Sequence, residues 1–308
     1  MSSSPARILL VFLDGVGIGE PDADVSPLVR ASAGLPTLLE LTGGITPTSA
    51  HARTSGPGGC AFPLDATLDV EGIPQSGTGQ VALLTGESAA QIHGRHFGPW
   101  TPVRLRPLVE ERSVLRRAVG AGRTVAFANA YPRGWPGPRG SRRIAGPPLA
   151  AQGAGVLDRH GEALAEGRAV SSEIVNDRWR WHRGHRAVPE VTAEQAGRNL
   201  ARISRDADLT LYAHYATDTA GHRKDMGAAI AALEVVDAFL AGLVDDLEAN
   251  TLLLIASDHG NLEDVRVGHT LNPALAVARG PGAERAAELS DLREVTPFML
   301  GLLGANPD

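Results

Sequence analysis

The chain has 308 residues, of which 43% are hydrophobic, and its formal net charge at pH 7 is −6. This length allows one large α/β domain with an excursion, or two modest domains, and the acidic balance argues against nucleic acid as a partner. Cys60 is the only cysteine, which excludes an internal disulfide and a thiolate zinc cluster. Any metal ion must therefore be held by oxygen and imidazole ligands.

The first apolar run, residues 8–13, is too short for a signal-peptide core or a membrane span, so we expect a cytoplasmic protein without a membrane partner. The same run predicts a buried strand. Glycines at 15, 17 and 19 follow it, but their spacing differs from the dinucleotide-binding fingerprint and no helix opens after them. Asp14 at the end of this strand is commonly a cap or turn residue, and it becomes a candidate metal ligand where other ligands converge on it.

A serine lies in a glycine-rich segment from Pro74 to Gly86, after a predicted short helix over 36–41 and a predicted loop over 50–63. The segment begins as a loop and continues as an apolar helix. Ser76 or Thr78 can cap this helix. Alternatively, Ser76 is a nucleophile, because a helix N-terminus favours phosphate oxygens and the glycines let a substrate approach. A serine needs a base or a metal ion beside it to attack, so both interpretations stay open here.

One α/β unit follows. Apolar residues at helical spacing predict a helix over 112–119, glycines end it, and residues 124–128 predict a strand. Asn129 comes directly after that strand, which makes it a candidate substrate contact.

An irregular segment, residues 133–186, interrupts the pattern. It contains ten arginines against five acidic residues, a local charge of +5, together with three of the four tryptophans. We divide the chain into a catalytic core, residues 1–132 and 187–308, and this Arg/Trp-rich excursion. The excursion is either a lid that attracts an anionic substrate or a solvated surface around a small satellite core.

Regular elements return after Thr192. We predict a capped helix from 193 to about 205, strands over 209–215, 251–256 and 274–278, an amphipathic helix over 226–247, and a last helix beginning at 296–297. Asp218 and His222 follow the first of these strands, four residues apart, and face the same side if their turn is helical. Asp258 and His259 directly follow the strand over 251–256, and His269 comes ten residues after His259.

Strands that alternate with helices predict an α/β fold in three layers, with a mainly parallel sheet between helices. Ligands of such sheets bind beyond the carboxyl ends of the strands, where the acidic and histidine side chains described above gather. Three carboxylates and three imidazoles are about what two divalent ions require, with Ser76 and substrate oxygens completing the coordination. The full candidate set is Asp14, Ser76, Asp218, His222, Asp258, His259 and His269.

These motifs resemble the alkaline phosphatase superfamily, and within it the branch of cofactor-independent phosphoglycerate mutase and phosphopentomutase. The resemblance is carried by Asp14-Gly15, by SDHGN from Ser257, by GHTLNP from Gly268 and by DTAGHRKD from Asp218. It implies one ion held by Asp218, His222 and His269 and a second held by Asp14, Asp258, His259 and the nucleophile Ser76. The donors permit Mn, Zn or Mg, and the family's mutases suggest Mn.

Two departures from the family pattern bear on the reaction. Gln80 stands where the family has a histidine after its glycine, and only about twenty residues, Glu87 to Pro107, are present where both mutases insert a large cap. Without that cap, water can resolve a phosphoserine. We therefore expect a phosphatase acting on a small phosphorylated metabolite, with a phosphomutase as the alternative and a non-catalytic metal-binding relative as the third possibility. The sequence leaves the oligomeric state open.

Overall fold

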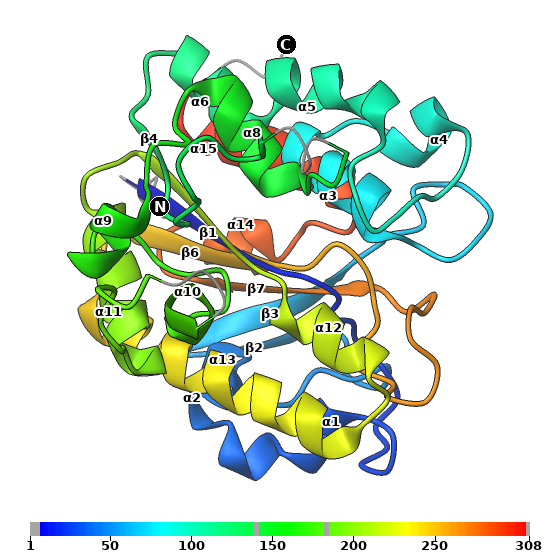
Figure 1. Ribbon diagram of the computed structural model, residues 1–308. Coiled ribbons are helices and arrows are strands. Elements are labelled where there is room, and N and C mark those ends of the chain that lie inside the picture. Colours follow the sequence, from blue (N-terminus) through cyan, green and yellow to red (C-terminus); the bar gives the residue numbers. More distant parts are fainter. Residues whose placement is uncertain (1–6, 138–141, 182–184, 306–308) are drawn as a thin grey trace.

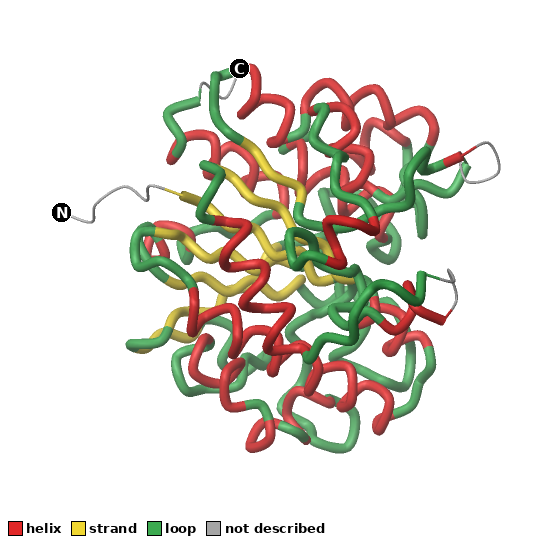
Figure 2. Tube along the Cα trace, turned by 60° about the vertical axis from the view of Figure 1, so that its left-hand side comes forward, coloured by secondary structure: helices red, strands yellow, loops and turns green. Residues whose placement is uncertain are grey.

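The computed structural model describes residues 7–137, 142–181 and 185–305. Its centre is a seven-stranded sheet in the order β2-β3-β7-β6-β1-β5-β4, which lies between two layers of helices (Figures 1 and 2). The strands are β1 (Arg7–Leu13), β2 (Thr54–Gly56), β3 (Gly59–Leu64), β4 (Val125–Phe127), β5 (Leu209–His214), β6 (Thr251–Ala256) and β7 (Ala274–Arg279). The predicted three-layer α/β arrangement is confirmed.

The central strands are mainly apolar and are buried along nearly their whole length, because helices cover both faces of the sheet. In β1, Ile8, Leu10 and Phe12 belong to one hydrophobic core. Leu9 and Val11 alternate with them and belong to the core on the other face. β1 pairs in parallel with both β5 and β6, so the carboxyl ends of these three strands meet at one edge of the sheet.

The prediction of a mainly parallel sheet is wrong, because the sheet is mixed. β7 runs antiparallel to β6 and β3 antiparallel to β7. The residues between β6 and β7 return the chain without the crossover helix that a parallel connection needs. Residues 50–63, predicted as loop, contain β2 and most of β3, which form an antiparallel pair. Pro63 is tolerated in β3 because β2 pairs only as far as Ala61.

Two helical layers enclose the sheet. The layer at the top of Figure 1 contains α3 (Ser76–Thr85), α4 (Ala89–His93), α5 (Arg106–Arg112), α6 (Val114–Gly120), α8 (Gly146–Ala154) and α15 (Leu292–Leu302). The layer at the bottom contains α1 (Pro27–Arg30), α2 (Pro36–Leu41), α11 (Ala193–Ser204), α12 (Ala216–His222) and α13 (Met226–Asp246). The shorter elements are η1 (Ser32–Gly34), η2 (Val103–Leu105), α9 (Gly161–Ala165), α10 (Asp177–Trp181) and α14 (Ala283–Ala286).

Helix starts differ from the predictions at two places. α3 begins at Ser76 with Gln75 as its N-cap residue, so neither Ser76 nor Thr78 caps it. α15 begins at Leu292, four residues before the predicted start, and Pro297 lies inside the helix. Its N-terminus is fixed by Asp291, the residue before it, through a capping box that the sequence analysis did not recognise.

Among the described residues, α13 is the one helix long and apolar enough to cross a membrane by length and composition. Its residues Leu233, Val236 and Leu240 are buried in the core of the lower layer, and it packs closely against α11. This is the packing expected of a core helix.

Among the described residues of the Arg/Trp-rich excursion, α8, α9 and α10 have different surroundings. α8 packs against α5, α6 and α3, and its residues Leu149 and Ala150 belong to the core of the upper layer. Residues from α9 and α10 instead form a small separate cluster, in which Leu164 and Trp179 are buried. The division into core and excursion stays a prediction, and α8 is the part of the segment that joins the upper layer.

Candidate metal centre

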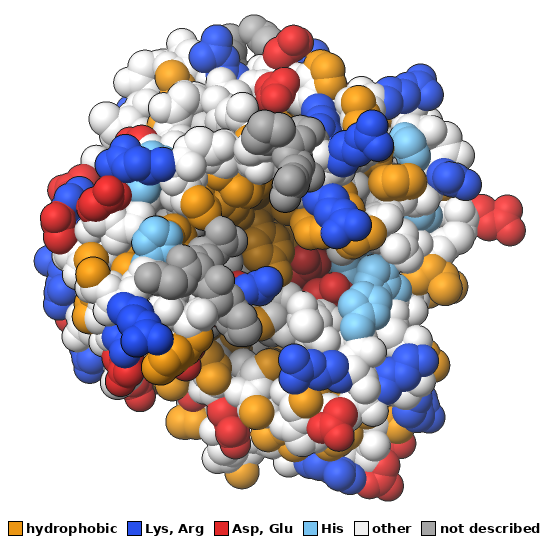
Figure 3. Space-filling model, viewed as in Figure 1, with side chains coloured by type: hydrophobic (Ala, Val, Ile, Leu, Met, Phe, Trp, Pro, Cys, Tyr) orange, Lys and Arg blue, Asp and Glu red, His pale blue; other side chains and the backbone are white. Residues whose placement is uncertain are grey.

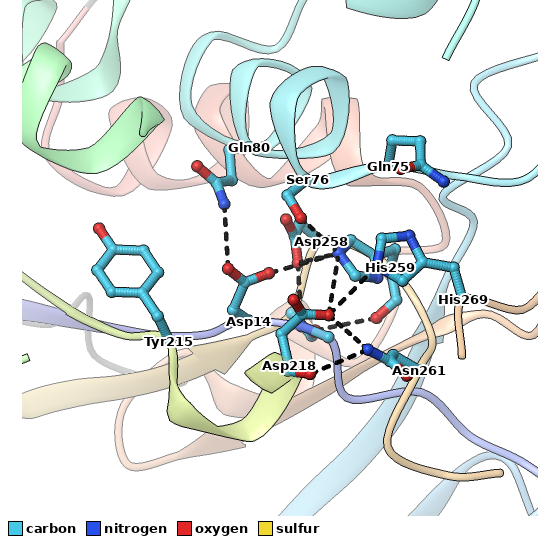
Figure 4. A network of polar contacts seen from close by, with 12 residues as sticks. Asp14, Gln75, Ser76, Gln80, Tyr215, Asp218, Asp258, His259, Asn261 and His269 are labelled. Carbon is cyan, nitrogen blue, oxygen red and sulfur yellow. Dashed lines mark hydrogen bonds and ion pairs between the residues drawn. The ribbon is translucent and has the colours of Figure 1, made fainter. Parts of the chain in front are cut away.

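The candidate ligands meet where β1, β5 and β6 end (Figure 4). Asp14 directly follows β1, and α12 begins two residues after β5 and carries Asp218 and His222. The loop between β6 and β7 supplies the other three ligands. Parallel pairing thus brings together residues that lie up to 255 positions apart in the chain, from Asp14 to His269.

The first donor set is Asp14, Asp258 and His259, all buried, whose ligand atoms lie within 4.8 Å of one another. His259 Nε2 is 3.4 Å from Asp14 Oδ1 and 3.7 Å from Asp258 Oδ1. Ser76 Oγ lies 2.9 Å from the same ring nitrogen. The proposed nucleophile therefore adjoins this set.

The second set is Asp218, His222 and His269, again within 4.8 Å. Its geometry converges on one point, because His222 Nε2 and His269 Nε2 lie 3.0 Å apart and each is 3.3 Å from an oxygen of Asp218. The helical turn of α12 places Asp218 and His222 on the same side, as predicted. Their role as ligands stays a prediction.

In His259 and His269, the ring nitrogen Nδ1 points away from the centre and lies close to a backbone carbonyl oxygen. His259 Nδ1 lies 3.2 Å from the carbonyl oxygen of Gly260, and His269 Nδ1 lies 3.1 Å from that of Pro74. A carbonyl only accepts, so Nδ1 carries the proton in each neutral ring. The Nε2 lone pair then faces the centre, which is the tautomer a metal ligand requires.

Burial and mutual charge shift the pKa values of the centre. Burial raises the pKa of Asp14 and raises that of Asp258 well above its usual range. Burial by itself lowers the pKa of His259, but the charges of Asp258 and Asp14 outweigh it and raise the value to about 10. For Asp218, burial acts to raise the pKa, yet the hydrogen bond with His269 and the charge of His259 hold it at about 2. Closely spaced carboxylates of this kind are stabilised by nearby positive charge.

Unsatisfied oxygen atoms show that a cation fits. Asp14 Oδ1 and Asp258 Oδ2 are buried and accept no hydrogen bond from the residues that the structure describes. Buried carboxylate oxygens normally have partners, and a bound cation supplies one. Oxygen and imidazole donors without thiolate suit borderline or hard divalent ions.

Asn261 and Gln80, neither of which the sequence predicted as a site residue, contact and orient two of these candidate ligands. Asn261 Nδ2 donates to Asp218 Oδ1 at 2.6 Å. Gln80 Nε2 lies 3.4 Å from Asp14 Oδ2, and its Oε1 accepts from the backbone N–H of Gly146 at 2.9 Å. The sequence showed Gln80 only as a departure from a motif, and nothing in its pattern indicated these partners.

A buried carboxylate holds the loop between β6 and β7. Glu263 is fully buried and accepts from the backbone N–H groups of Gly17 and Asn261 at 3.0 and 2.7 Å. Thr270 and Asn272 also donate to it.

The glycines near Asp14 are explained by close packing, since a Cβ on Gly15 would lie 2.6 Å from Asp218 Oδ1.

A pocket of about 380 Å³ adjoins the centre. Figure 3 shows the hollow, with hydrophobic side chains inside it and acidic and histidine side chains at one side. It is lined by Asp14, Ser76, Gln80, Pro99, Trp100, Tyr131, Trp135, Arg143, Ala145, Pro148, Ser172, Glu173, Arg178, Tyr215, Asp218 and Thr219. The excursion thus contributes much of the wall of the pocket.

The assignment of Asn129 as a substrate contact is corrected by the structure. Asn129 is fully buried and does not line this pocket. Its Nδ2 donates to the carbonyl of Ala213 at 2.7 Å, and its Oδ1 accepts from the N–H of Ala213 at 2.8 Å. The amide continues the pairing of β4 with β5 beyond the end of the strand and has a structural role.

Comparisons with known proteins agree with this architecture. A family model described as Metalloenzyme superfamily matches residues 183–307. The 2,3-bisphosphoglycerate-independent phosphoglycerate mutase of Halobacterium salinarum is 34% identical over 109 residues, which are 32% of this chain and 22% of that protein. Its counterpart from Ruegeria pomeroyi is 36% identical over 129 residues, which are 38% of this chain and 25% of that protein. The chain spans roughly a quarter of the length of the curated relatives it matches.

Solved structures match over the whole chain. Alkaline phosphatase from the Antarctic bacterium TAB5 has a TM-score of 0.59 at 12% identity and covers 99% of this chain and 100% of its own. The PH0037 protein from Pyrococcus horikoshii has a TM-score of 0.56 at 14% identity and covers 99% of this chain and 98% of its own. These structures show the fold. With the family model and the curated relatives, they confirm the resemblance to the alkaline phosphatase superfamily.

Proposed function

We propose that this protein is a two-metal phosphoryl-transfer enzyme in which Ser76 is the nucleophile, and that it releases phosphate from a small phosphorylated metabolite. The observation that carries the proposal is the position of Ser76, whose Oγ lies 2.9 Å from His259 Nε2 and faces the pocket. A hydroxyl with only a structural role has no need to adjoin both a donor set and a cavity.

The donor sets hold two divalent ions, for which we propose manganese. When bound, such ions supply Lewis-acid stabilisation of the charge on the transferring group. Asp14, Asp258, His259 and Ser76 would hold one ion, and Asp218, His222 and His269 would hold the other. The geometry described above fits both.

The chain's own groups bind and orient the phosphoryl group. Ser76 is the first residue of α3, so the positive end of the helix dipole lies beside the phosphate oxygens. Ser76 Oγ forms a bond to phosphorus while the bond from phosphorus to the leaving oxygen breaks. The serine proton passes to solvent, and the leaving oxygen takes up a proton. Water then cleaves phosphoserine and regenerates the hydroxyl.

The segment between α3 and α5 supports phosphatase activity over mutase activity. In the resembling mutases this position carries a large cap, whereas here it contains only the short α4 and η2. A mutase must retain its dephosphorylated intermediate, and this segment is too short to form such a cap, although Pro99 and Trp100 from it line the pocket. The names of the curated relatives favour the phosphomutase as the second candidate.

The test combines metal analysis with turnover. Wild type, Ser76→Ala, Thr78→Ala and Ser88→Ala are compared for metal content and for hydrolysis of an aryl phosphate. Ser88 is a matched control outside the pocket, where its hydroxyl contacts Arg293. We expect Ser76→Ala alone to lose turnover and acid-quenched wild type to carry phosphate on the Ser76 peptide. Unchanged turnover in Ser76→Ala would remove this residue as the nucleophile.

Two further measurements separate the candidate functions. Phosphorylated pentoses and glycerates are followed for phosphate release and for isomerisation. Phosphate release supports the phosphatase, and isomerisation without release supports the phosphomutase. A protein that binds two ions but turns over no phosphate ester would instead be a non-catalytic metal-binding relative.

A further inference from the structure

Aromatic side chains form much of the pocket beside Ser76. Trp100, Tyr131, Trp135 and Tyr215 all line it. Tyr131 and Trp135 are in edge contact, with ring centroids 4.6 Å apart, and Tyr131 also stacks on Phe127 at 5.9 Å. Rings supported in this way form a rigid surface on which a flat group can stack.

Trp100 is fixed close to the nucleophile. A Cβ on Gly77, the residue after Ser76, would collide with the carbonyl of Trp100, so the two segments touch. Phe97 also pairs with the N-terminus of α3, since its carbonyl accepts from the N–H of Thr78 at 3.0 Å. Trp100 as a residue remains 39% exposed and is therefore available to a ligand. A group stacked on Trp100 would lie within reach of a phosphate at Ser76.

The polar edge of the pocket is anchored to the core. The carbonyl of Ser171 accepts from the Tyr212 hydroxyl at 2.8 Å, and that of Ser172 lies 2.8 Å from His214 Nδ1. The next residue, Glu173, lines the pocket and pairs with Arg178 at 3.0 Å. The charge of Arg178 is thus matched by a carboxylate of the same wall.

Charge and size favour a particular leaving group. A leaving group with its own carboxylate would approach Glu173, whose partner Arg178 is already neutralised by it. Arg143 also lines the pocket, and its positive charge suits the phosphate that every such substrate carries. A volume of about 380 Å³ also suits a ring-sized group better than a three-carbon acid. A neutral, flat group can stack on the aromatic side chains and is not repelled by the carboxylate of Glu173.

We infer that the substrate is a phosphomonoester whose leaving group carries a flat aromatic ring, and that this ring stacks in the pocket formed by Trp100, Trp135, Tyr131 and Tyr215. This inference rests on the proposed function of Ser76. Nucleoside monophosphates and simple aralkyl phosphates share this chemistry.

Adenosine 5′-monophosphate and ribose 5-phosphate form a matched pair for the test. Both release phosphate from the same primary hydroxyl, so the base is the principal difference between them. We expect kcat/KM of the metal-loaded wild type to be about tenfold higher for the nucleotide, the size of effect that one stacked base gives. Equal values, or a higher value for ribose 5-phosphate or 3-phosphoglycerate, would overturn the inference. Benzyl phosphate distinguishes the two sources, because a rate as high as that of the nucleotide assigns the pocket to simple rings.

Tryptophan variants show whether the preference for the nucleotide arises from stacking in this pocket. Trp100→Ala and Trp135→Ala should each lower the ratio of the two kcat/KM values severalfold. Trp181→Ala is the matched control, because this tryptophan is 65% exposed and does not line the pocket. A ratio that falls equally in all three variants, or in none, would contradict stacking at this site.

A binding measurement separates failure of the inference from failure of the proposed function. If the wild type turns over none of these esters, the phosphoryl-transfer proposal fails, but adenosine contains no phosphate and can still bind. Calorimetry should detect adenosine binding to wild type and to Trp181→Ala, and weaker binding to Trp100→Ala. Absence of adenosine binding to the wild type would overturn the inference whatever the turnover shows.

Discussion

The metal centre and the pocket wall differ in how they are built. The candidate centre combines a buried donor set with a second set that is partly exposed at His222. Most of its candidate ligands follow the ends of three neighbouring strands, so the sheet itself fixes their positions. The pocket wall comes from irregular segments around Trp100, Trp135 and Glu173, and a few hydrogen bonds such as those of the Ser171 and Ser172 carbonyls anchor it to the core. We infer that the sheet sets the chemistry and that the segments above it set the choice of substrate. Substitutions in the two regions test this division, first through losses of activity and then through losses of stability.

The largest loss is expected for Asp258→Asn. Asp258 is fully buried and one of its oxygens has no described hydrogen-bond partner, so the neutral amide keeps the shape and removes a ligand charge. Turnover should fall by more than about 100-fold, since even outer-layer partners of a metal cost about 10- to 100-fold. Metal content and kcat are measured beside Asp264→Asn, a change in the same loop at a residue paired with Arg266. Equal losses in both variants would mean that the loop was disrupted and not the centre.

His269→Ala should remove one ion and leave the other. His269 belongs to the second donor set, and its ring centroid is 4.1 Å from that of His259 in the first. Metal analysis after dialysis measures the effect, and His222→Ala should match it because the two rings share a set. His51→Ala is the control at an exposed histidine. Loss of both ions together would show that the two sites do not bind separately.

Gln80→Leu should weaken activity or metal affinity by about 10- to 100-fold, the range seen for residues that orient metal ligands. The change removes the amide that lies 3.4 Å from Asp14 Oδ2. Titration of metal into the apoprotein measures the affinity, with Gln152→Leu at an exposed position of α8 as the control. An affinity and a kcat equal to those of wild type would show that Gln80 does not position Asp14.

The sequence predicted β1, β5 and β6 because buried parallel strands are largely apolar runs. It predicted the candidate metal ligands from the polar residues that follow those runs. It missed β2 and β3, since a short hairpin of Gly, Ser and Pro has the composition of a loop. It missed the antiparallel direction of β7, which depends on where the chain returns and not on the residues of β7. Gln80 was also missed, because its partners Asp14 and Gly146 each lie 66 positions away in the chain. The aromatic wall was missed because its rings come from separate segments that only the fold brings to one pocket.

A polar residue directly after a strand is not always part of a functional site. Asn129 occupies such a position, but its side chain extends the pairing of β4 with β5. Asn129→Ala should lower the free energy of unfolding by about 1–3 kcal/mol, the cost of leaving buried polar groups of Ala213 unpaired. Urea unfolding measures this loss, and kcat/KM of the folded fraction should match that of wild type. A selective rise in KM with unchanged stability would restore Asn129 as a substrate contact.

The smallest effect concerns stability at acidic pH and depends on His214, at the end of β5. Burial lowers the pKa of His214 to about 4, even though its contact with the Ser172 carbonyl acts to raise it. Between pH 4 and the unfolded value of 6.5, the unfolded chain binds more protons, so this group makes stability fall as the pH falls through that window. His214→Gln keeps an N–H donor but cannot titrate, so wild type should lose about 2 kcal/mol more than the variant between pH 7.5 and 5. Urea unfolding in chelator at both pH values measures the difference. Equal losses in the two proteins would mean that His214 is already protonated in the fold and that the polar edge of the pocket is anchored in another way.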